Sequence, residues 1–218
     1  MFKRLAAVLL TVWAAFAPGG ARAETRLGAL GGIGFATLQQ SGSEHFATFD
    51  DRLVIRGAVG GVIELRWAGR TSLRLELLYA GKGSRYQDPD CPCLRPTGYV
   101  PKDNDLHLSY LEMPILAAVT YEEGRWHRFL TAGLTPGLRL SARAVRDGQE
   151  SDESPTYRSW DLGLSLGGGV TYAAARARPF VEARITVSLL AVDDSSRRNV
   201  AVHLLVGVTL PVSHRPPP

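Results

Sequence analysis

Residues 106–121 alternate two kinds of side chain with a period of two, and this pattern restricts the fold more than any other feature of the chain. One parity is apolar throughout and consists of Leu111, Met113, Ile115, Ala117, Val119 and Tyr121. The other parity carries a charge, Glu112, in the middle of the run. Because successive strand residues point to opposite faces, the pattern predicts a strand with an apolar outer face and a polar inner face. Such a strand suits a closed sheet in lipid, and a tilted strand crosses a bilayer in about 9–11 residues.

The first residues of the chain predict a secretory signal peptide over residues 1–23. Lys3 and Arg4 form a basic start, residues 5–17 are apolar, and residues 21–23 are a small-x-small cleavage site. We expect cleavage before Glu24. The apolar run is shorter than the roughly 18 residues of a membrane-spanning helix, so a retained anchor is the less favoured alternative. The barrel domain is then expected at residues 24–213, with a disordered tail at residues 214–218.

The net charge argues against a nucleic-acid partner. The whole chain has a formal charge of +4 and a pI near 9.3. Cleavage of the signal peptide removes three basic residues, which lowers the Lys and Arg count from 25 to 22 against 21 acids. The mature chain is therefore near neutrality, and a basic surface for nucleic acid loses its support.

Alternating segments recur along the rest of the chain and predict an all-β protein. The predicted strands are residues 25–40, 53–67, 71–86, 106–121, 127–145, 157–172, 179–192 and, after a loop at residues 193–197, a last strand through Leu210. The loops between them are alternately long and short, as in bacterial barrels with long outer loops and short periplasmic turns. We therefore predict an eight-stranded antiparallel up-and-down transmembrane β-barrel. It is expected in the bacterial outer membrane with both termini periplasmic.

Aromatic side chains are expected near both membrane interfaces, as is usual for such barrels. The periplasmic rim is predicted to contain Trp67, Tyr121, Trp126, Tyr172 and Phe180. The outer rim is predicted to contain Tyr86, Tyr110, Tyr157 and Trp160.

Charged side chains on the inward parity predict an interior ion-pair network. Its members are Arg56, Glu64, Arg66, Arg74, Glu76, Glu112, Arg139, Arg143, Asp161, Glu182 and Arg184. Since a narrow eight-stranded barrel is filled by its own side chains, we expect these groups to form a hydrogen-bonded plug without an open pore. This favours a non-enzymatic structural or surface-interaction role, and a proton or ion path is the alternative. No cofactor and no metal are expected.

His107 and Ser109 lie two residues apart on one face near the predicted outer rim. The pair is similar to the exterior His and Ser of barrel lipid A deacylases. A serine beside a base can act as a nucleophile, so esterase chemistry is conceivable at this position. A lipid-modifying enzyme is therefore an alternative function. An acidic partner is missing from the predicted outward positions of the adjoining strand tops, which are Gly81, Gly83, Ala142 and Ala144.

A soluble lipocalin-like carrier is a further alternative. It would turn the apolar parity inward and expose Glu112, Asp161 and Arg184 to water.

Cys91 and Cys93 are candidates for a local disulfide, an intermolecular link or a two-thiol metal pair. Two thiols do not complete a four-ligand zinc site.

Residues 110–116, Tyr-Leu-Glu-Met-Pro-Ile-Leu, resemble the Y-L-E-I-P-L-L stretch of PorT-like outer-membrane β-barrel proteins. Residues 160–170 are similar to the D-x-G-x-x-x-G-x-G-V strand of that family, and residues 207–211 are similar to its last strand. The resemblance implies an OmpA-like eight-stranded barrel, in many members without an assigned activity. We expect membrane lipids and lipopolysaccharide as partners, and envelope or surface proteins as candidate partners.

Overall fold

The computed structural model describes residues 24–40, 53–87, 103–146, 149–152, 154, 157–174, 176–191 and 197–212. Every regular element in these ranges is a β-strand. The strands are β1 (Glu24–Gln40), β2 (Val54–Ala68), β3 (Thr71–Gln87), β4 (Asp103–Glu112), β5 (Ile115–Glu123), β6 (Trp126–Arg146), β7 (Gln149–Asp152), β8 (Trp160–Tyr172), β9 (Arg178–Ser188) and β10 (Arg197–Pro211). No helix in the described ranges is long and apolar enough to cross a membrane.

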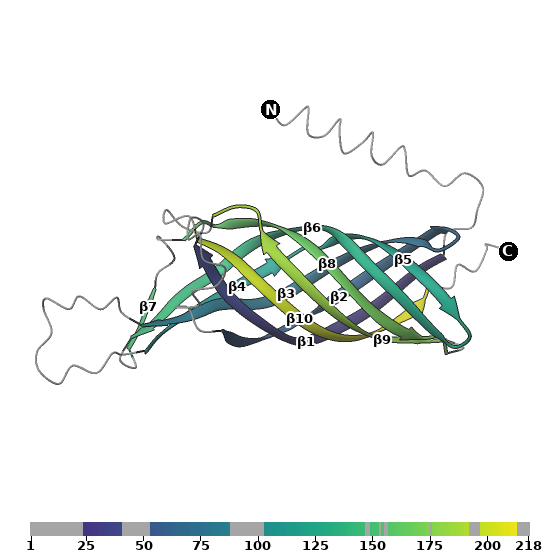
Figure 1. The fold of residues 1–218 in the computed structure, drawn as a ribbon, viewed down its shortest axis with the longest axis horizontal. Coiled ribbons are helices and arrows are strands. Elements are labelled where there is room, and N and C mark those ends of the chain that lie inside the picture. Colours follow the sequence, from purple (N-terminus) through teal and green to yellow (C-terminus); the bar gives the residue numbers. More distant parts are fainter. Residues whose placement is uncertain are drawn as a thin grey trace, which may run out of the picture.

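The strands close into a single antiparallel barrel (Figure 1). Each strand of the wall pairs with its neighbour along the chain, and β1 pairs with β10 to complete the ring. β4 and β5 each pair with both β3 and β6, so together they occupy a single strand position in the wall. We call each strand position of the wall a stave. The barrel therefore has eight staves, and the predicted fold class is confirmed.

The stave made of β4 and β5 is interrupted where a continuous strand was predicted. Met113 and Pro114 separate the two strands, because proline has no N–H to donate to the ladder. Met113 instead donates its N–H to the carbonyl of Pro136 at 2.8 Å, and Pro114 accepts a hydrogen bond from Glu76 N at 3.0 Å. The two faces stay in phase across the break, so the predicted inward parity of Glu112 is unaffected.

A β-bulge in β6 reverses the faces of its outer part. Ser109 of β4 pairs with Ser141, whereas the next residue, Tyr110, pairs with Arg139, so Leu140 is an extra residue. Such an insertion turns every following side chain to the other face. Ala142 and Ala144 are consequently buried inside, and their predicted outward placement was wrong.

Strand β7 lies between two predicted strands, in a segment where no strand was predicted. β7 pairs with the outer end of β6, from Arg143 opposite Asp152 to Arg146 opposite Gln149. β6 is 21 residues long and continues past the point where its pairing with β8 stops, at Leu138 opposite Trp160, so its free edge gives β7 a partner. Two other strands are shorter than predicted, since β8 begins at Trp160 and β9 ends at Ser188.

The two ends of the barrel differ. At one end lie the short connections, where Gly69 and Gly124 have φ of 57° and 62°, a left-handed conformation that glycine adopts readily. Both ends of the described chain lie here too, because Val212 donates its N–H to the carbonyl of Thr25 at 2.9 Å. β7, the end of β3 and the beginning of β4 lie at the other end (Figure 1). We call these the short-turn end and the long-loop end.

The outer surface of the barrel is aliphatic. Every stave exposes leucine, isoleucine or valine side chains, such as Ile55, Leu77, Leu130, Leu166 and Val206. Large aliphatic side chains exposed on all sides are expected of a surface that faces lipid and not water.

Aromatic side chains lie on this surface at both ends. Trp126 packs edge-to-face on Tyr172 at 5.1 Å near the short turns, and Trp160 is 61% exposed. Tyr110, Tyr157 and Phe180 were predicted at the rims but are buried in the interior. The side chains of Trp67 and Tyr86 lie outside the described part of the structure.

Candidate functional site

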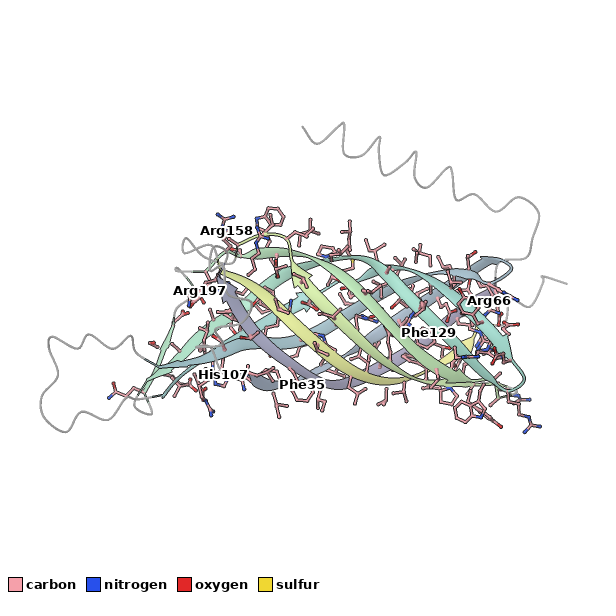
Figure 2. All side chains as sticks on the ribbon, in the orientation of Figure 1. Phe35, Arg66, His107, Phe129, Arg158 and Arg197 are labelled. Carbon is pink, nitrogen blue, oxygen red and sulfur yellow. The ribbon has the colours of Figure 1, made fainter. Side chains whose placement is uncertain are left out.

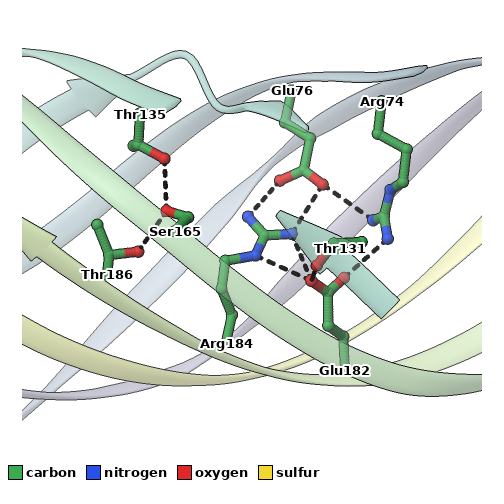
Figure 3. A network of polar contacts seen from close by, with 8 residues as sticks. All are labelled: Arg74, Glu76, Thr131, Thr135, Ser165, Glu182, Arg184 and Thr186. Atoms are coloured by element: carbon green, nitrogen blue, oxygen red, sulfur yellow. Dashed lines mark hydrogen bonds and ion pairs between the residues drawn. The ribbon is translucent and has the colours of Figure 1, made fainter. Parts of the chain in front are cut away.

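The centre of the barrel contains a four-membered cluster of buried charges, Arg74, Glu76, Glu182 and Arg184 (Figure 3). Arg184 donates two parallel hydrogen bonds to the carboxylate of Glu76, at 2.7 and 2.8 Å, and a third to Glu182 at 2.9 Å. Arg74 lies 2.8 Å from Glu182 and 2.9 Å from Glu76. Two positive and two negative charges are thus fully paired inside the barrel.

This central cluster connects opposite walls of the barrel. Arg74 and Glu76 lie on β3, and Glu182 and Arg184 lie on β9, four staves away in a ring of eight. The pairs are 108 residues apart in the sequence. The guanidinium of Arg74 also lies 5.0 Å from the ring of Phe180 and 5.4 Å from that of Phe129, within cation–π range. Thr131 of β6 donates a further hydrogen bond to Glu182 at 3.1 Å.

A second buried cluster consists of Lys82, Glu112 and Asp161. The ammonium of Lys82 lies 2.5 Å from Glu112 and 3.8 Å from Asp161. Ser188 donates a 2.5 Å hydrogen bond to Asp161. Lys82 also lies 5.1 Å from the ring of Tyr110. Lys82 was missing from the predicted network, although it has the same inward parity on its strand as Arg74 and Glu76.

Uncharged layers fill the space around these clusters. A chain of hydroxyls runs from Thr135 to Ser165 at 2.6 Å and on to Thr186 at 2.8 Å (Figure 3). One apolar layer consists of Leu30, Ala58, Val62, Leu78, Ala80, Phe129, Phe180 and Leu205. A second consists of Leu38, Leu106, Leu108, Tyr110, Ala142 and Tyr157. Small barrels are filled by side chains in this way.

A small cavity of about 30 Å³ lies toward the short-turn end. It is lined by Glu64, Arg66, Arg74, Ala118, Thr120, Phe129, Thr171, Arg178, Phe180 and Thr209. Arg66 is paired with Glu122 at 2.9 Å beside this cavity. The predicted interior residues Glu64 and Arg66 therefore line this cavity together with Arg74 of the central cluster, which is opposite Glu64 in the strand register.

Three other residues of the predicted network lie elsewhere. Arg139 donates hydrogen bonds to the backbone carbonyls of Ser154, Tyr157 and Arg158 and so fastens the segment before β8. Arg56 is half-buried, and its Nη1 donates to the carbonyl of Ile55 at 3.2 Å. The third is Arg143, whose side chain is exposed.

Arg143 was predicted inside but lies outside. Its side chain is 63% exposed and lies 3.6 Å from Glu150 of β7. The reason is the extra residue Leu140, which reverses the parity of the outer part of β6. A strict period of two does not reveal such an insertion, so the sequence pattern placed Arg143 on the wrong face.

His107 and Ser109 lie on the outer face of β4, at the long-loop end. The hydroxyl group of Tyr79 donates a hydrogen bond to Oγ of Ser109 at 3.1 Å. Asp105, which shares this face, binds Arg85 through two hydrogen bonds of 2.6 and 3.0 Å. Ser109, the potential nucleophile, and Asp105, the nearest acid on the strand, are therefore both hydrogen-bonded to side chains other than His107.

Cys91 and Cys93 lie outside the described residues. Across the described ranges, no group of three or more His, Cys, Asp or Glu side chains is placed to hold a metal ion.

An aliphatic exterior, a closed eight-stave wall and a charged, paired interior define a bacterial outer-membrane type of β-barrel. Comparison with protein families matches residues 18–194 to the outer membrane protein beta-barrel domain. The chain belongs to this family, which supports a location in the bacterial outer membrane. A search of curated proteins gave no match.

Three solved structures with a related arrangement are distant from this chain in sequence. Neisserial surface protein A is 16% identical with a TM-score of 0.49, and the alignment covers 86% of this chain and 97% of that one. OprG from Pseudomonas aeruginosa is 12% identical with a TM-score of 0.46, covering 89% and 99%. Ail, the attachment invasion locus protein of Yersinia pestis, is 9% identical with a TM-score of 0.42, covering 87% and 99%.

Proposed function

We propose that this protein is a non-enzymatic outer-membrane barrel whose sealed interior makes it a rigid support for its long loops. These loops would contact surface ligands or envelope partners. The observation that carries the proposal is the central cluster, in which Arg184 and Glu76 join opposite walls through a doubly hydrogen-bonded ion pair. A transport path would need space along the axis, and the axis here is occupied by paired charges, hydroxyls and apolar layers.

We also propose an orientation and a processing site. Short connections and both described chain ends share one end of the barrel, and bacterial barrels place their short turns in the periplasm. The long-loop end would then face outward. Removal of residues 1–23 would leave Glu24 as the first residue, at the beginning of β1. The segment at residues 110–116 further suggests a PorT-like member of the family.

Cysteine accessibility on intact cells tests this orientation. In a Cys91→Ser, Cys93→Ser background, Gln149→Cys of β7 would react with a membrane-impermeant maleimide, because Gln149 is exposed at the long-loop end. Arg125→Cys, exposed in a short turn, is the matched variant and would react only after the outer membrane is opened. Labelling of Arg125→Cys alone on intact cells would refute the proposed orientation.

Conductance across a planar bilayer tests the sealed interior. We expect insertion of the refolded protein without ohmic channels. Stable openings of the unmodified barrel would refute the plug and favour an ion path.

The deacylase alternative receives less support from the geometry. Ser109 is hydrogen-bonded to Tyr79 and Asp105 is bound by Arg85, whereas a serine nucleophile needs a neighbouring base that is oriented by a third group. Mass spectrometry of lipid A from cells that express the protein would decide. An unchanged acylation pattern is expected, and the loss of an acyl chain would refute the non-enzymatic role.

A further inference from the structure

The short-turn end of the barrel carries a net positive charge, and Arg66 marks this end in Figure 2. Among the described residues, seven arginines and four glutamates lie here outside the central cluster. The arginines are Arg26, Arg66, Arg70, Arg125, Arg128, Arg176 and Arg178, and the glutamates are Glu24, Glu64, Glu122 and Glu123. Three ion pairs join members of the two groups, namely Arg26 with Glu24, Arg66 with Glu122, and Arg128 with Glu123.

The excess of positive charge lies in the short connections. Of the other five charges, Arg178 and Glu64 line the same cavity and offset each other. The remaining three are Arg70, Arg125 and Arg176, which we call the turn arginines. One lies between β2 and β3, one between β5 and β6, and one between β8 and β9. All three are exposed, and none pairs with a carboxylate in the part of the chain that the structure describes.

Arg70 and Arg125 are held in the same way. Each directly follows a glycine with a left-handed φ. The carbonyl of each accepts a backbone hydrogen bond from the next hairpin, at 2.7 Å for Arg70 and 2.8 Å for Arg125. The guanidinium of Arg70 lies 5.8 Å from the ring of Tyr121, and Nη1 of Arg125 donates a hydrogen bond to the hydroxyl of Tyr172 at 3.3 Å. These contacts fix the two arginines, but both tyrosines are neutral and leave the charges uncompensated.

The turn arginines surround the end of the barrel. A ring of eight staves has four connections at one end, and three of them carry a turn arginine. The fourth position, between β10 and β1, is where both described chain ends lie. Since short turns in a closed ring are held in place before a ligand arrives, binding to them costs little ordering.

Hydrogen-bond donors continue from the turns into the barrel. The cavity of about 30 Å³ at this end, which we call the mouth cavity, is lined in part by Arg66, Arg178, Thr120, Thr171 and Thr209. A buried water needs at least about 10–15 Å³, so the mouth cavity has room for a small polar group such as a carboxylate. These side chains face the barrel axis, whereas bilayer lipids surround the outer wall. A ligand for the mouth cavity therefore approaches along the axis.

We propose that the short-turn end docks an acidic peptide segment of a periplasmic partner protein. The turn arginines pair with side-chain carboxylates of that segment, because guanidinium groups bind carboxylates through two parallel hydrogen bonds. The mouth cavity accepts one further carboxylate. This surface is distinct from the long loops, and its place in the cell rests on the proposed orientation, because the short-turn end must face the periplasm.

Binding of a fluorescent decaglutamate peptide to the refolded full barrel in phosphatidylcholine nanodiscs tests the proposal by anisotropy. The site variant is Arg70→Gln, Arg125→Gln, Arg176→Gln. The matched control removes three exposed arginines of the long-loop end and so lowers the net charge equally. It is Arg143→Gln, Arg158→Gln, Arg198→Gln. Heat-dependent mobility on gels establishes that each variant is folded.

We expect the site variant to weaken peptide binding at least tenfold, which corresponds to about 1.4 kcal/mol, and the control to leave it unchanged. Added salt should weaken binding to the unmodified barrel, because exposed charges are screened. A decaglutamine peptide should not bind. Equal affinities of the site variant and the control, or of the two peptides, would overturn the proposal.

Two other anionic partners are outcomes of the same comparison. Retention of phosphatidylglycerol by the unmodified barrel but not by the site variant, without peptide binding, would assign the turn arginines to the inner leaflet. Binding to purified peptidoglycan without peptide binding would assign them to the cell wall. Either result would overturn the proposal. Both ends of the barrel are accessible in a nanodisc, so failure of the peptide to bind is distinguishable from a wrong orientation, which the cysteine accessibility experiment reports.

Discussion

Replacement of Glu76 by glutamine tests most directly whether the central cluster holds the barrel together. Glu76 accepts both hydrogen bonds of the Arg184 fork and lies 2.9 Å from Arg74, with its side chain fully buried. Glutamine keeps the size of the side chain but removes its charge. The central cluster would then contain two cations and one anion, in a region shielded from water.

The expected loss follows from the cost of a stranded buried charge. Removal of one partner of a buried ion pair typically costs about 3–5 kcal/mol, whereas exposed pairs contribute about 1 kcal/mol or less. Glu123→Gln breaks the exposed pair with Arg128 and is the matched control. We expect Glu76→Gln to lower the free energy of unfolding by about 3 kcal/mol more than the control does.

A double variant separates charge imbalance from general damage. Glu76→Gln with Arg184→Met restores neutrality, because Arg74 and Glu182 remain paired at 2.8 Å. We therefore expect the double variant to be more stable than Glu76→Gln alone. Urea unfolding of the refolded barrel in detergent, followed by tryptophan fluorescence, gives the three values. A Glu76→Gln barrel as stable as the Glu123→Gln barrel, or additive losses in the double variant, would refute the reasoning.

Three further predictions concern the second cluster and the wall. Glu112→Ala should lower the temperature at which the folded band disappears on gels, because it removes the carboxylate 2.5 Å from buried Lys82; an unchanged temperature would contradict the interior assignment. Gly83→Ala should cost about 1–3 kcal/mol in the same urea assay, since φ is 127°, whereas Gly57→Ala, with open space around its Cβ, should be neutral. Deletion of Leu140 should remove the bulge and turn the outer part of β6 over, so that a cysteine at position 143 loses its reactivity toward maleimide in detergent; retained reactivity would show that the bulge does not set the face.

Much of the architecture could be predicted from the sequence because a strand has only two faces. The alternation in residues 106–121 and its repeats determined the strands, the outward aliphatic surface and the inward parity of Arg74, Glu76, Glu182 and Arg184. Loop lengths alone indicated which connections share an end. Local periodicity is sufficient for these features, since each depends on residues close together in the chain.

The tertiary structure decided what depends on distant residues or on a change of register. The pairing of the buried charges was one such feature. Arg184 pairs with Glu76 across the barrel, 108 residues away in the sequence, and Lys82 pairs with Glu112. The bulge at Leu140 was the other, because a single extra residue in one strand is defined only by the strand opposite. That register shift moved Arg143 from the expected interior to the exterior.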